Sequence, residues 1–198
     1  MVLWFMISWL LIQAFLGLNG FYTETKSIPP KLIFMILPPM ILMVVIFGTK
    51  KGKSFLNHFN ESQLTLLQII RLPVEIGLLL LFIHHMVPRL MTFEGRNFDI
   101  FSGITAPLIW YFGYKKFLIG KKLLLTWHFI CLALVLNVVI HGILSAPTVF
   151  QAMAFDQPNI AIIYFPFNWL PSVIVPIVIF SHLACIKPLL FPPASFRS

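Results

Sequence analysis

The side chains best able to do chemistry lie inside or beside long apolar runs. Arg71 and Glu75 are four positions apart on one predicted helix, so they share a face and lie within reach of each other. One interpretation is a mutually neutralising pair that packs inward, with Pro73 opening the helix beside it. The other is a proton or ion relay, in which Glu75 carries the proton and Arg71 adjusts its affinity. Ionisable groups within a bilayer are costly, so the pair is a functional hypothesis by default.

A second group of polar residues lies where the fourth predicted apolar run begins. The stretch 93–107 carries two acids, an arginine, an amide and two hydroxyls. Prolines 73, 107, 171 and 176 could kink helices around a site here, as broken helices do in transporters. We expect an outward-facing pocket for a small molecule or ion, lined by Arg96, Asp99, His84, His85, His141 and Asp156.

The histidines also raise the alternative of a haem-binding or other redox subunit. His84, His85 and His141 fall near the outer helix ends, and His128 and His182 fall near the inner ends. Two histidine layers are what a diheme protein needs. However, thirteen positions separate His128 from His141, which is about 20 Å of rise but about 220° of rotation. That rotation suits a shared haem channel poorly, so no cofactor is assigned.

A metal site could combine outer-side histidines with a carboxylate. Zinc accepts such nitrogen and oxygen ligands, here His84 or His85, His141, and Asp99 or Glu94. No HExxH or paired-cysteine spacing supports it, so the metal content is left open. The chain also lacks a Gly-x-Ser-x-Gly elbow, a P-loop and a dinucleotide fingerprint. The sequence therefore does not favour an enzyme.

Composition indicates a membrane protein. Hydrophobic residues make up 59% of the 198 residues and charged residues 10%, against about 25% charged in soluble domains. The first apolar run lacks a basic flank and a cleavage site, which favours a retained helix over a signal peptide. We predict one all-α integral membrane domain over 1–198, with six transmembrane helices at about 2–18, 31–48, 63–87, 98–114, 123–144 and 166–186.

The distribution of positive charge predicts the topology. The formal net charge is +8, but the basic residues form short clusters between apolar runs, which argues against nucleic-acid binding. Short loops rich in Lys and Arg stay in the cytoplasm, so both termini are predicted inside, in the bacterial inner membrane. The inner-side residues are Lys50, Lys51, Lys53, Lys115, Lys116, Lys121, Lys122, Lys187 and Arg197.

The connector between the last two predicted helices, 145–165, is long and aromatic. Helix connections in bundles usually run about 2–8 residues. We expect a partly helical cap over the outer mouth, or alternatively an interfacial loop with its aromatic rings at headgroup level. If it instead docks a membrane-protein partner, the chain would be an accessory subunit without a site of its own. The bilayer is the one partner expected in every case.

Several landmarks resemble those of a family of small bacterial membrane proteins with six helices. They are the stretch 97–108, Asn137, the segment 143–147, and Pro171, Pro176 and His182. The resemblance covers about residues 71–190. It implies a six-helix membrane fold and no activity, so it assigns no site residue. The chain has His128 after Trp127, where the family often has an amide.

Overall fold

Apolar runs broken by proline, glycine and lysine clusters fold into helices. The computed structural model describes residues 2–191, and Arg197 lies outside this part of the chain. The all-α prediction is confirmed, since these residues contain helices and no strand. The α-helices are α1 (Val2–Leu18), α2 (Ile33–Gly48), α3 (Lys50–Leu56), α4 (Glu61–Leu67), α5 (Arg71–Ile83), α6 (Ile100–Ile109), α7 (Lys121–Leu144) and α8 (Val175–Leu190).

Some of these helices are long and apolar enough to cross a membrane. Three reach that length within residues 2–191, namely Glu61–Ile83, Lys121–Leu144 and Leu170–Leu190. A fourth is reached if α2 and α3, which meet at a bend of 94°, count as one span. Helix α1 is apolar but shorter. The helices are thus compatible with a membrane protein, while three or four spans by length fall short of the predicted six.

Two predicted helix ends need correction. The third predicted helix stops at Ile83 and not at residue 87, because His85 takes a left-handed conformation (φ 59°) and Pro88 follows. The last one begins at Leu170, four residues later than predicted, with Pro171 in its first turn. Both corrections lengthen the connectors at the same end of the bundle.

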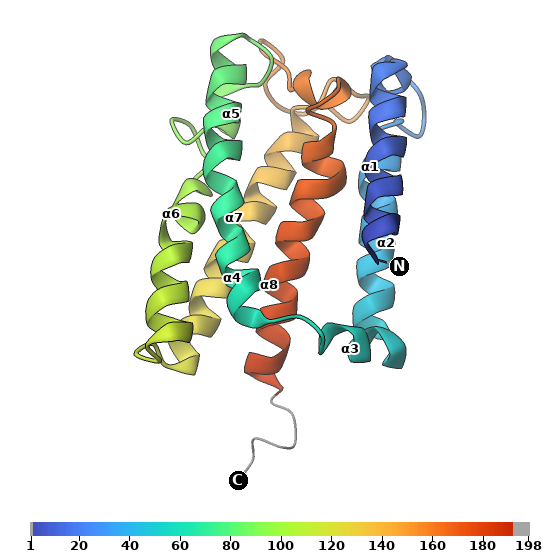
Figure 1. Cartoon of the computed structure of the whole chain (residues 1–198). Helices are drawn as coiled ribbons and strands as arrows, with labels where there is room; N and C mark the ends of the chain where they lie inside the picture. The colour runs from blue at the N-terminus through green and yellow to red at the C-terminus, as the bar shows by residue number, and fades with distance from the viewer. Residues whose placement is uncertain (1, 192–198) are drawn as a thin grey trace.

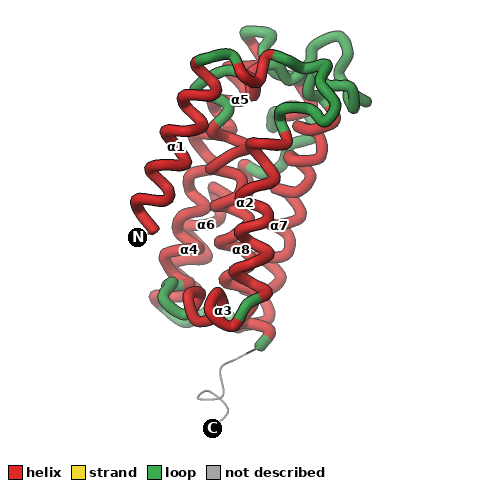
Figure 2. The backbone as a smooth tube through the Cα atoms, turned by 90° about the vertical axis from the view of Figure 1, so that its right-hand side faces the viewer, coloured by secondary structure: helices red, strands yellow, loops and turns green. Residues whose placement is uncertain are grey.

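The helices form a core group with a pair beside it. Helices α4, α5, α6, α7 and α8 pack around a common centre, and α1 and α2 stand together at one side (Figure 1). The same arrangement appears in the turned view, with α3 lying across one end of the bundle (Figure 2). The two lysine-rich segments, Lys50–Leu56 and 115–121, lie at that end. The connectors 84–99 and 145–165 lie at the opposite end.

Hydrogen bonds from polar side chains fix α1 to the core group. Asn168 donates from Nδ2 to the Gln13 carbonyl at 2.6 Å, and Trp9 donates from Nε1 to the Ser172 carbonyl at 2.9 Å. In the connector after α1, the Tyr22 hydroxyl donates to Gln13 Oε1 at 2.7 Å. Burial raises the pKa of Tyr22 to about 12, because it disfavours the charged phenolate.

Two of the prolines lie next to changes of helix type. Pro73 follows a 3-10 turn, Gln68–Ile70, which joins α4 to α5. Pro107 precedes a π-helical segment, Trp110–Lys115. Proline removes a backbone donor and crowds the carbonyl four residues earlier, so the hydrogen-bond pattern shifts locally. The first of these shifts, the 3-10 turn, lies where Gln68 and Arg71 enter the core.

The 145–165 connector folds back across the ends of α5 and α7. Asn159 donates from its backbone nitrogen to the Ser145 carbonyl at 2.8 Å, and Ala161 donates to the Met86 carbonyl at 3.0 Å. Gln157 adds a side-chain bond to the Val87 carbonyl at 2.6 Å. One short 3-10 turn, Ala161–Ile163, is the helical part of this segment. Backbone bonds to the residues that follow α5 and α7 make the connector a cover at this end.

Candidate functional site

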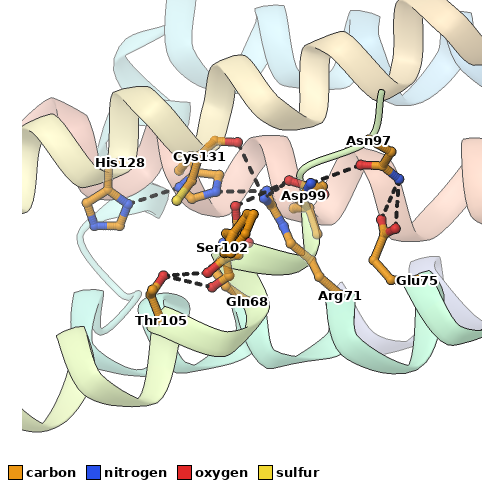
Figure 3. A network of polar contacts seen from close by, with 12 residues as sticks. Gln68, Arg71, Glu75, Asn97, Asp99, Ser102, Thr105, His128 and Cys131 are labelled. Carbon is orange, nitrogen blue, oxygen red and sulfur yellow. Dashed lines mark hydrogen bonds and ion pairs between the residues drawn. The ribbon is translucent and has the colours of Figure 1, made fainter. Parts of the chain in front are cut away.

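A buried ion pair lies at the centre of the core group. Arg71 on α5 pairs with Asp99, which immediately precedes α6, and the two residues are only 2% and 5% exposed (Figure 3). Arg71 Nη1 also donates to the Cys131 carbonyl of α7 at 3.3 Å. Ser102 Oγ lies 3.3 Å from the same Asp99 oxygen. Three helices therefore meet at one guanidinium.

Hydrogen-bond chemistry fixes the protons of two histidines next to this pair. Arg71 Nη2 lies 2.9 Å from His182 Nε2, and a guanidinium can only donate, so that nitrogen accepts. The proton of neutral His182 is then on Nδ1, which lies 3.0 Å from His128 Nδ1 and donates to it. His128 consequently carries its proton on Nε2, a buried atom with no partner among residues 2–191. Both imidazoles are neutral in this arrangement.

A buried carboxyl stands on the other side of Arg71. Glu75 is 1% exposed and receives hydrogen bonds from Asn97 Nδ2, at 2.7 Å to Oε1 and 2.8 Å to Oε2. It forms no ion pair with any described residue. Asn97 Oδ1 in turn accepts from the backbone nitrogen of Asp99 at 2.9 Å, so Asn97 connects the Glu75 carboxyl to the Asp99 backbone (Figure 3). Arg71 and Glu75 therefore do not form the direct ion pair of the first interpretation, because partners from the 84–99 connector bind both side chains.

Local structure explains why these side chains point inward. In a 3-10 turn, residues three apart are eclipsed, so Gln68 and Arg71 enter the core on one face. Glu75 follows four residues later on the same face of α5. Gln68 Nε2 donates to Ser181 Oγ of α8, while its Oε1 atom is buried with no partner in the described chain. Polar groups therefore line the core from Gln68 to Glu75.

The six residues expected to form an outward pocket do not meet. Arg96, His84 and Asp156 are exposed at separate positions, and Asp99 is drawn inward to Arg71. The remaining two bind other partners: His85 lies 3.2 Å from Gln157 Oε1, and His141 lies 2.8 Å from the carbonyl of Asn137 in its own helix. Helix ends and loops can satisfy their polar groups locally or in water. Only Asp99 was close enough to a buried cation to be held in the core.

The residues of this candidate site that sequence reasoning missed are polar but common in type. Asn97, Gln68, Ser102 and Ser181 each carry one neutral polar group, which a membrane helix tolerates in many positions. The sequence places His128 and His182 near the same inner helix ends but does not predict the contact between them. A usable signal was the spacing Gln68–Arg71–Glu75, which places three polar side chains on one face of an apolar helix.

The geometry also bears on the haem and metal alternatives. Axial ligands of a haem lie on opposite faces of the porphyrin, whereas the His128 and His182 imidazoles contact each other directly. No haem fits between them. Within residues 2–191, no three His, Cys, Asp or Glu side chains are grouped so that they could hold a metal ion, so the outer zinc set is not assembled.

Fold and site together describe a helical protein with membrane-length helices around a buried ionisable core. No protein-family model matches the chain, and no curated protein or solved structure matches it either. The site therefore has to be interpreted from its own chemistry.

Proposed function

We propose that this chain is a multi-pass protein of the bacterial inner membrane that carries a small ion, the proton, through its core group. Six apolar segments and the clustering of lysines at one end of the bundle support six spans with both termini in the cytoplasm. The resemblance to small six-helix bacterial membrane proteins agrees with that topology. In this orientation Glu75 lies toward the outer side and His128 toward the cytoplasm.

One observation carries the proposal: Glu75 is a buried carboxyl that forms no ion pair with any residue in the described part of the chain. A carboxylate in an apolar interior is costly unless it is paired, and here its hydrogen-bond donor is the Asn97 amide. A purely structural bundle would place a neutral amide or an apolar residue at this position at lower cost. A group that binds and releases a proton must be able to exist in both forms, and Glu75 meets that requirement.

Arg71 determines how such a proton could move. Its guanidinium does not give up a proton in proteins, so it separates the carboxyl groups of Glu75 and Asp99 from the two histidines. A continuous proton wire is interrupted at this point. We infer a carrier that rearranges around the Arg71–Asp99 pair, and not an open proton channel.

Replacing Glu75 with glutamine tests the proposal. The variant keeps a polar side chain of the same size but cannot bind the proton. In vesicles that contain a pH-sensitive dye, a potassium diffusion potential should drive protein-dependent proton uptake in the wild type. We expect Glu75→Gln to lower that rate to the level of protein-free vesicles.

The matched control is Glu24→Gln, a change to an exposed carboxyl in the α1–α2 connector. It should leave the uptake rate unchanged. Infrared spectra should also show a protonated-carboxyl band that is lost in Glu75→Gln and kept in Glu24→Gln. Equal uptake in wild type and Glu75→Gln, or a wild-type rate no higher than that of empty vesicles, would contradict the proposal.

A further inference from the structure

The turn between α6 and α7, residues 115–122, carries a concentrated positive charge. It contains four exposed lysines, two at each end. No acidic residue occurs within 100–155, and none of the four lysines forms an ion pair with any residue among 2–191. Like charges this close together repel one another. The turn therefore favours an anionic partner that the described chain does not supply.

Two large apolar side chains stand between the lysine pairs. Phe117 and Leu118 are 82% and 73% exposed, and Phe117 has a φ angle of 55°, in the left-handed region that bulky residues rarely adopt. Backbone bonds hold this form, because Leu118 donates to the Phe112 carbonyl at 2.8 Å and Lys116 donates to the Tyr111 carbonyl at 2.9 Å. The turn is thus ordered, while the described chain leaves both apolar side chains uncovered.

The first lysine pair lies against aromatic rings of the preceding π-helical segment. Lys115 Nζ is 5.4 Å from the centroid of the Trp110 ring, and Lys116 Nζ is 5.8 Å from the centroid of the Tyr111 ring. Ammonium groups within about 6 Å of a ring centroid are attracted to the ring. Trp and Tyr are the residues enriched at membrane–water interfaces. These contacts restrict two of the four ammonium groups, so binding an anion orders them at a lower entropic cost.

Helix length places the turn at the level of lipid head groups. Helix α7 has 24 residues and is long and apolar enough to cross a membrane. At 1.5 Å per residue it is about 36 Å long, which exceeds a hydrocarbon layer of about 30 Å but not the bilayer of about 40–45 Å that includes the head groups. The first residues of α7 therefore lie among the head groups when the helix crosses a bilayer. Lipid phosphates lie at that depth, with hydrocarbon beside them.

The other lysine-rich segment at this end has charge without exposed hydrocarbon. Helix α3 carries the exposed residues Lys50, Lys51 and Lys53 at the same end of the bundle (Figure 1). Its Leu56 is buried and packs with Leu64 in the core. The two segments therefore differ in the apolar pair, which only the α6–α7 turn presents, and α3 provides a matched control.

We propose that the α6–α7 turn binds the head group of an anionic phospholipid. The lysine ammonium groups contact its phosphate, and Phe117 and Leu118 enter the adjacent hydrocarbon. A soluble acidic partner would match the charge but leave the two apolar side chains in water, whereas a lipid matches both. The proposal requires that α7 crosses a bilayer and does not depend on proton transport.

Native mass spectrometry of the full chain in detergent micelles tests this site. The protein is titrated with dioleoylphosphatidylglycerol or with dioleoylphosphatidylcholine, which have the same acyl chains, and the lipid-bound masses give the affinity for each. We expect the anionic lipid to bind about tenfold more tightly, because several lysines contribute to its binding. Equal affinity for the two lipids would overturn the proposal, and this comparison needs no variant.

Two double variants locate the binding. Lys116→Gln with Lys121→Gln removes one lysine from each pair and should weaken phosphatidylglycerol binding about tenfold, with phosphatidylcholine binding unchanged. Lys50→Gln with Lys51→Gln removes the same charge from α3 and should change the affinity by less than about twofold. Lys116→Arg with Lys121→Arg keeps the charge and should keep the binding. Equal losses in the two glutamine variants would show a general charge effect and overturn the proposal.

Phe117→Asn tests the apolar contact. Asparagine tolerates the left-handed conformation, so the turn keeps its form while the hydrocarbon side chain is lost. We expect phosphatidylglycerol binding to weaken about threefold or more. Thermal unfolding shows whether each variant remains folded. Unchanged binding by Phe117→Asn, or displacement of the lipid by inorganic phosphate or a polyglutamate peptide, would show that the turn binds any anion and would contradict a lipid site.

Discussion

Replacing Asp99 with alanine is expected to destabilise the protein by about 3–5 kcal/mol, because the Arg71 guanidinium stays buried without a counter-ion. Arg71 would keep its bonds to the Cys131 carbonyl and His182, but both of these partners are neutral. The loss of Asp99 also leaves Ser102 without its carboxylate acceptor. We therefore expect a large effect from one short side chain.

The measurement is reversible unfolding in mixed micelles, followed by tryptophan fluorescence. Glu94→Ala removes an exposed carboxyl from the same connector and should change the free energy of unfolding by less than about 0.5 kcal/mol. Combining Asp99→Ala with Arg71→Met removes both charges and should restore much of the lost stability. If Asp99→Ala behaves like Glu94→Ala, the buried ion pair does not hold the core together.

A second large effect is expected at Gly95, in the connector that presents Asn97 and Asp99. A Cβ atom added there would lie 2.1 Å from the Arg89 carbonyl oxygen and 2.8 Å from the Leu90 Cα atom. Both obstacles are backbone, so the connector must move. Gly95→Ala should cost about 3 kcal/mol, the upper end of the range for overpacking, and displace Asn97 from Glu75.

Gly77 supplies the matched control for that prediction. It lies within α5, and a Cβ atom there would meet nothing within 4 Å. Gly77→Ala should therefore stabilise the helix by about 0.5–1 kcal/mol, since alanine restricts the unfolded chain more than glycine does. Thermal unfolding should thus shift in opposite directions for the two alanine variants. A similar shift for both would show that the connector tolerates rearrangement at Gly95.

Some features of the site could be predicted because they are local in sequence. The four-residue spacing of Arg71 and Glu75 requires a shared helix face, and both side chains do lie in the core. Their partners could not be predicted in this way. Asp99 is 28 positions from Arg71 and His182 is 111 positions away, and no periodicity relates residues on different helices.

The outward pocket failed for a related reason. The sequence does not distinguish a polar residue that faces water at a helix end from one that bonds within a connector or points into the core. Asp99 and Arg96 are three positions apart, yet one is buried against a cation and the other is exposed. Asn97 lies between them, and its side chain binds both the Asp99 backbone and the Glu75 carboxyl, which is a tertiary contact.

By itself, the sequence determined that the protein is helical and rich in membrane-length apolar segments, because hydrophobic content and local spacing act within one helix. The tertiary structure decided which polar groups share the core. That outcome depends on how helices pack side by side. A buried charge selects its partner from whichever helix brings an opposite charge within reach, which for Arg71 is the start of α6.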